Sequence, residues 1–173
     1  MPATKTPTAS ESAARVLRQV WVTDEAGDPV LPVDSVQIAQ KLGIQVFETD
    51  LPDGVSAALA GRPNTDPIIL LRTTDSTNRK RFSTAHELGH FMKRLDEGRL
   101  DEEFEYVDLR GHSASKGTEP DETYANAFAA ALLMPEESLR SAAGSSPDPI
   151  ALSQQFRVSL EAMSIRLKVL GLA

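Results

Sequence analysis

Cysteine is absent from the 173-residue chain, and this absence excludes several kinds of site. Without a thiol, the chain forms no disulfide, no zinc ribbon and no iron–sulfur cluster, and it has no cysteine nucleophile. Histidine is almost as scarce, because only His86, His90 and His112 are present. Any bound metal ion must therefore be held by histidine nitrogens and carboxylate oxygens.

Long hydrophobic runs are also lacking, although 40% of the residues are hydrophobic. No run approaches the roughly 20 apolar residues of a membrane-spanning helix, which excludes an integral membrane protein of that kind. Residues 1–12 are polar, and we expect no secretory signal there. The 18 basic residues are outnumbered by 25 acidic ones, so the formal net charge is −7. This balance argues against non-specific binding of nucleic acid.

The acidic excess is concentrated in one segment. Residues 95–122 contain ten acidic and three basic side chains, which accounts for the whole net charge of −7. The rest of the chain is formally neutral, so the global charge says little about its other surfaces. We expect the acidic segment to be able to recruit a basic partner, such as a DNA-binding protein.

The length fits a single domain. Residues 1–10 have almost nothing to bury and predict a disordered tail, which leaves 11–173 as the folded domain. A helix capped by Ser12 and ending near Trp21 is expected to open that domain.

The front half continues with a short helix and a sheet. The helix is expected to begin after Asp34 and to end at Gly43. Apolar runs at 44–47, 55–59 and 68–71 predict three strands, which we expect to form a small antiparallel sheet.

The back half is predicted to be mainly helical. After a helix over 78–93 and a polar, acidic segment from 96 to about 121, further helices are expected at 122–134, 136–143, 148–156 and 160–170. The predicted fold class is α+β: a small antiparallel sheet packed on the helix 78–93, with a helical C-terminal part.

The sequence His86-Glu87-Leu88-Gly89-His90 matches the pattern H-E-x-x-H on that first long helix. Residues four apart lie on one face of a helix, so both imidazoles can reach one metal ion. The intervening glutamate is offset in angle, and it is suited to take a proton from water at the metal. The alternative is that His86 and His90 are ordinary helix histidines. Two of only three histidines fall into this pattern on a predicted helix with apolar flanks, which favours a metal site.

A catalytic zinc site needs a third protein ligand, and three residues compete for this role. Asp96 has the spacing of an extended H-E-x-x-H motif, but Lys93 occupies the position where that motif has a glycine. His112 lies in a Gly/Ser-rich segment and is the second candidate. We favour Glu122, because Asn126 lies one helical turn later and could orient His86 or His90. The alternative role of Glu122 is to stabilise the start of its own helix.

Three segments together resemble the ImmA/IrrE metallopeptidase family. They are RKRFSTAHELGH at 79–90, ETYANAFAAALLMP at 122–135 and LSQQFRVSLEAMSIRLKVLGL at 152–172. The resemblance implies a gluzincin-like zinc endopeptidase of the cytoplasm, with His86, His90 and Glu122 as ligands and Glu87 as the general base. It also implies a protein substrate, most often a helix-turn-helix transcriptional repressor.

Two other hypotheses remain open at this point. The protein could titrate a repressor without cutting it, or residues 151–172 could bind DNA as a helix-turn-helix-like pair. We favour simple packing for this pair, because Arg166 and Lys168 are too few cations for phosphate contacts in the second helix.

A basic run and two tyrosines near the motif have no assigned role. Arg79 and Arg81 could bind an acidic substrate segment, whereas Lys80 is expected to be solvated. Tyr106 and Tyr124 each carry a hydroxyl that could stabilise an oxyanion.

Overall fold

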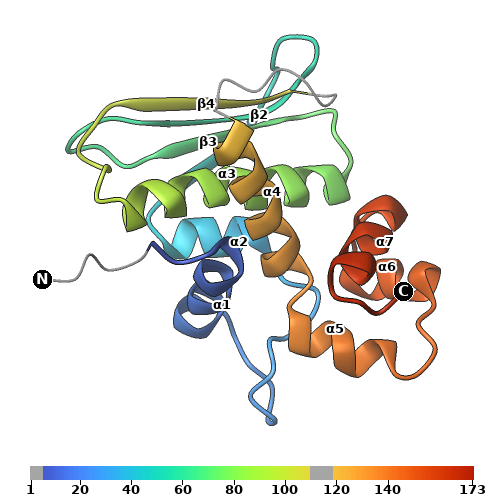
Figure 1. Cartoon of the computed structure of the whole chain (residues 1–173). Helices are drawn as coiled ribbons and strands as arrows, with labels where there is room; N and C mark the ends of the chain where they lie inside the picture. The colour runs from blue at the N-terminus through green and yellow to red at the C-terminus, as the bar shows by residue number, and fades with distance from the viewer. Residues whose placement is uncertain (1–5, 110–118) are drawn as a thin grey trace, which may run out of the picture.

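A four-stranded sheet lies on one long helix, and six further helices complete the part of the chain that the structure describes (Figure 1). The structure is a computed structural model, and it describes residues 6–109 and 119–173. The expected α+β fold class is confirmed. No helix of these residues has the length and apolar character needed to cross a membrane.

The first helix, α1 (Ala9–Val20), begins earlier than expected. Thr8 is its N-cap and forms a capping box with Glu11, so Ala9 and Ser10 belong to the helix rather than to a disordered tail. Ser12 is not the cap, because it lies inside the helix and its backbone N–H donates to the Thr8 carbonyl. Its buried hydroxyl donates to Asp96. Capping by Thr8 was missed because threonine, glutamate and serine all recur within this short polar stretch.

The sheet is mixed rather than antiparallel. After α2 (Ser35–Lys41), the chain forms β1 (Gln45–Thr49), β2 (Val55–Gly61) and β3 (Ile68–Arg72), and the strand order is β1-β3-β2-β4. The β2 and β3 strands form the expected antiparallel hairpin, but β1 pairs with β3 in parallel. Alternation of apolar residues predicts which face of a strand is buried and does not encode strand direction.

The fourth strand, β4 (Phe104–Leu109), lies within the polar, acidic segment for which no strand was predicted. It pairs antiparallel with β2 and forms one edge of the sheet. One face of the hairpin is buried against the helix beneath it, through Ala57, Leu59, Ile69 and Leu71.

The helix beneath the sheet is α3 (Thr77–Asp96), which carries the H-E-x-x-H motif. It packs against β2, β3 and β4 on one side and against α2 and α4 (Glu119–Leu133) on the other (Figure 1). Helix α1 packs on α4. The chain then continues through α5 (Glu136–Ala143), α6 (Pro149–Phe156) and α7 (Leu160–Val169).

Candidate metal centre

Both motif histidines lie in the interior of the molecule, on the most buried part of α3. The side of the helix from Ser83 to Met92 is enclosed by the sheet and by α4, and His86 and His90 are 4% and 2% exposed. Ser76 caps the helix by accepting a hydrogen bond from the backbone N–H of Arg79. A long, capped and enclosed helix holds the two imidazoles in a fixed relationship.

Helix α4 brings Glu122 to the two imidazoles. Glu122 Oε2 lies 3.2 Å from His86 Nε2, and Glu122 Oε1 lies 3.2 Å from His90 Nε2. The two Nε2 atoms are themselves 3.2 Å apart. These three residues form a group whose ligand atoms all lie within 4.8 Å of one another.

The donor set and its spacing fit zinc. Two ligand atoms at about 2.0–2.1 Å from a tetrahedral ion lie about 3.4 Å apart, which is close to the separations observed here. Two nitrogens and one carboxylate also form the donor set of catalytic zinc sites, which keep the fourth position open. His86, His90 and Glu122 could therefore hold one zinc ion.

Asn126 contacts the first histidine rather than the second. Its Oδ1 lies 3.0 Å from His86 Nδ1, so it can accept a hydrogen bond from that nitrogen and leave Nε2 free for a metal. It lies one turn after Glu122 on α4, and both residues therefore face α3. The spacing in the sequence left open which histidine this side chain would reach.

Glu87 is completely buried beside the ligand group. Neither of its carboxylate oxygens has a hydrogen-bond partner among residues 6–109 and 119–173. Burial raises the pKa of this carboxyl to about 8, and the charges of Asp108 and Glu122 act in the same direction. A carboxyl group with a pKa near neutrality is suited to exchange protons with a reacting molecule.

The two imidazoles titrate differently in the metal-free protein. Burial lowers the pKa of His90 to about 4, and the charge of His86 adds to this effect. Burial also acts to lower the pKa of His86, but its hydrogen bond with Glu122 and the nearby carboxylates raise that pKa overall. A neutral His90 is in the state that binds metal.

Strand β4, which was not predicted from the sequence, also contacts the site. The Tyr106 ring stacks on the His90 ring, with centroids 4.2 Å apart and an angle of 13° between the planes. Asp108 accepts hydrogen bonds from Ser83 Oγ at 2.8 Å and from Arg79 Nη2 at 3.0 Å. The available signal for this strand was the placement of the two aromatic residues Phe104 and Tyr106 at alternate positions within an acidic segment.

The competing residues lie elsewhere. Asp96 is bound to α1, because it accepts hydrogen bonds from Ser12 Oγ and Arg15 Nη2. Tyr124 lies against Lys93, whose ammonium group is 5.8 Å from the ring centroid, and not against the two imidazoles. His112 lies outside the described residues.

Two buried arginines attach the C-terminal helix pair to the rest of the molecule. Arg81 on α3 donates to the backbone carbonyls of Val33 and Phe156. Arg166 on α7 donates to the Met134 carbonyl and is 6% exposed, so it is not available to phosphate groups. Lys80 is not simply solvated, because it forms an ion pair with Glu48.

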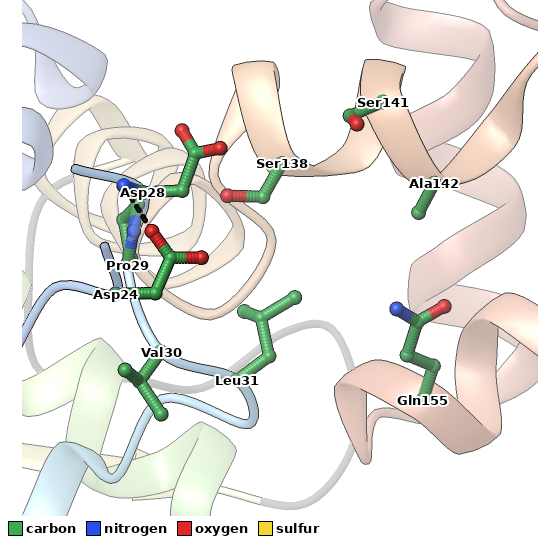
Figure 2. A pocket seen from close by; sticks show the side chains of 9 residues that line it. All are labelled: Asp24, Asp28, Pro29, Val30, Leu31, Ser138, Ser141, Ala142 and Gln155. Carbon is green, nitrogen blue, oxygen red and sulfur yellow. Dashed lines mark hydrogen bonds between the residues drawn. The ribbon is translucent and has the colours of Figure 1, made fainter. Parts of the chain in front are cut away.

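A cavity of about 350 Å³ lies between residues 24–31 and the helices α5 and α6 (Figure 2). Asp24 points toward it, but Oδ1 of this side chain already accepts hydrogen bonds from the backbone N–H groups of Ala26 and Asp28. None of the proposed ligands lines this cavity.

The chain matches a peptidase family model described as the IrrE N-terminal-like domain, over residues 39–168. This chain belongs to that family. The resemblance in its three segments is thereby confirmed, and the IrrE-like chain carries a His–His–Glu group of the kind a metallopeptidase needs. No curated protein matches it.

Among solved structures, the IrrE-like chain is similar to a Mycobacterium tuberculosis transcriptional regulator. The two are 20% identical with a TM-score of 0.60, and the match covers 92% of this chain and 46% of the regulator. At this identity the likeness shows the fold alone. The IrrE-like chain spans less than half of the regulator's length.

Proposed function

We propose that this protein is a zinc-dependent endopeptidase that hydrolyses a peptide bond in a protein partner. The proposal rests above all on the convergence of His86, His90 and Glu122, with separations of 3.2 Å between their donor atoms. Membership of a peptidase family supports hydrolysis as the reaction. A zinc ion would supply a Lewis acid for the scissile carbonyl and would make an attacking water more acidic.

Two residues of the chain would supply proton transfer and the orientation of a ligand. Glu87, buried and without a partner among the described residues, accepts the proton of the attacking water and then passes it to the leaving amine. Asn126 keeps His86 in the tautomer that presents Nε2.

We infer that the substrate is a helix-turn-helix transcriptional repressor, which would place the reaction in the cytoplasm. This inference comes from the resemblance to the ImmA/IrrE family. The acidic segment offers limited further support. Glu97, Glu102, Glu103 and Asp108 all form ion pairs within the chain, so part of its charge is already neutralised.

The test is incubation of the purified protein with a candidate helix-turn-helix repressor, sought among the products of neighbouring genes, with zinc, with a chelator, and with Glu87→Gln in place of the wild-type protein. We expect cleavage only by the zinc-loaded wild-type protein, together with unchanged zinc binding by Glu87→Gln. Cleavage by Glu87→Gln at the wild-type rate would refute the role of Glu87. Release of an intact repressor from its operator would instead favour a regulatory protein that binds without cutting.

A further inference from the structure

The two histidines of the ligand group are held in different ways. His86 Nδ1 lies 3.0 Å from Asn126 Oδ1. His90 Nδ1 is buried, and it meets no hydrogen-bond partner in the part of the chain that the structure describes. A histidine that binds metal through one ring nitrogen ordinarily donates from the other, and that hydrogen bond fixes the orientation of the ring. Among the described residues, the orientation of His90 therefore depends on contacts other than a hydrogen bond at Nδ1.

The ring of Tyr106 occupies one face of His90. The planes are nearly parallel, at 13°, and the centroids are 4.2 Å apart. The ring of His86 meets His90 at 80°, with centroids 4.8 Å apart. Rotation of the His90 ring about its Cβ–Cγ bond would drive its edge into Tyr106, so the stacked ring restricts that rotation.

Tyr106 is itself held firmly by its neighbours on β4. Two residues after it, Asp108 accepts hydrogen bonds from Ser83 and Arg79. Two residues before it, the Phe104 ring lies 4.6 Å from the guanidinium carbon of Arg94. Alternate residues of a strand share a face, and these three residues contact α3 along its length. The strand is thus anchored to the motif helix on both sides of Tyr106.

We propose that Tyr106 is a positioning residue, whose aromatic ring holds the His90 imidazole in the orientation that presents Nε2 to the metal. The ring does for His90 what the Asn126 hydrogen bond does for His86. This inference rests on the proposed function, because it assumes that His90 is a metal ligand. It requires the aromatic face of Tyr106 and does not require the hydroxyl.

The test compares Tyr106→Phe, which keeps the ring, with Tyr106→Leu, which keeps apolar bulk but removes the flat face. Zinc affinity is measured by competition with a chromophoric chelator. We expect Tyr106→Phe to bind zinc within about threefold of wild type. For Tyr106→Leu we expect a loss of about 10- to 100-fold, the range found for residues that orient metal ligands. The matched control is Tyr124→Leu, which removes the other tyrosine and should leave affinity unchanged.

A second readout does not depend on zinc, and its wild-type measurement does not depend on the stability of a variant. In the metal-free wild-type protein, the ring protons of His90 should show an upfield NMR shift from the stacked Tyr106 ring. The shift should persist in Tyr106→Phe and disappear in Tyr106→Leu. Absence of this shift from wild type would overturn the inference even if Tyr106→Leu failed to fold.

The outcomes separate this inference from the proposed function. Zinc binding that His90→Ala does not weaken would overturn the metal site, and the positioning role with it. Binding that depends on His90 but is unchanged in Tyr106→Leu would overturn the positioning role alone. An equal loss of affinity in Tyr106→Phe and Tyr106→Leu would assign the effect to the hydroxyl and contradict the proposal.

Discussion

Gly89 and Ala125 bring the two helices of the metal centre into backbone contact. A Cβ atom added to Gly89 would lie 2.7 Å from Ala125 Cα and 3.0 Å from the Ala125 carbonyl oxygen. Glu122 and Asn126 lie on the same stretch of α4 as Ala125, so this contact sets how closely both reach the imidazoles. The glycine inside the H-E-x-x-H motif therefore allows Glu122, the proposed third ligand, to come close to the imidazoles.

Gly89→Ala should weaken zinc binding by tenfold or more, because α4 must move away from α3. In a helix without this contact, the same change would stabilise the protein by about 1 kcal/mol. Here the added methyl group is expected to cost about 1–3 kcal/mol instead, as overpacking does. Competition with a chelator measures the zinc affinity, and urea unfolding measures the free energy of unfolding. A more stable variant with wild-type affinity would show that the helices do not meet at this point.

Glu122→Ala and Asp96→Ala should separate the third ligand from its competitor. Loss of the Glu122 carboxylate removes one of three donors, so zinc should no longer co-purify in stoichiometric amount. Asp96→Ala should keep zinc and instead lose about 1–3 kcal/mol of stability, since it breaks the contacts with Ser12 and Arg15. Metal analysis of both purified variants decides the matter, and the reverse pattern would reassign the ligand.

Glu87→Gln should stabilise the metal-free protein at neutral and alkaline pH. The pKa of Glu87 is raised to about 8 in the folded state, so ionisation favours unfolding as pH rises from about 4.5 to 8. Glutamine carries no such charge, and the gain should reach up to about 5 kcal/mol at alkaline pH, since the rise from 4.5 to about 8 is 3.5 pKa units and each unit corresponds to about 1.4 kcal/mol.

The pH dependence of that difference is the control. In chemical denaturation with a chelator present, the two proteins should have similar free energies of unfolding near pH 4. They should diverge as the pH rises toward 8. A difference that is constant with pH would mean that ionisation of Glu87 is not its source.

Arg81→Gln should detach the C-terminal helices from α3. The Arg81 guanidinium donates to carbonyls of Val33 and Phe156 in the interior, and their loss should cost about 2–4 kcal/mol. The neighbouring Lys80→Gln removes a more exposed ion pair with Glu48 and should cost less than about 1 kcal/mol. Thermal unfolding of both variants provides the comparison. Equal losses of stability in the two variants would show that the Arg81 hydrogen bonds do not hold the C-terminal helix pair against α3.

Several features could be predicted from the sequence because they depend on residues close together in the chain. The motif helix, the α2 helix with its Asp34 cap and Gly43 stop, and the β2–β3 hairpin follow from local periodicity and turn residues. The strand β4 was missed because its alternation is short and acidic residues surround it. The capping of α1 by Thr8 was missed because several residues there could act as caps.

The sequence by itself determined that any metal ligands are histidines and carboxylates, and that two of them share one helix face. Only the tertiary structure decided the parallel pairing of β1, the contact of Asn126 with His86 rather than His90, and the stacking of Tyr106 on His90. Each of these depends on how separate segments pack. Spacing along the chain specifies the face of an element, whereas contacts across segments depend on the depth and direction of packing.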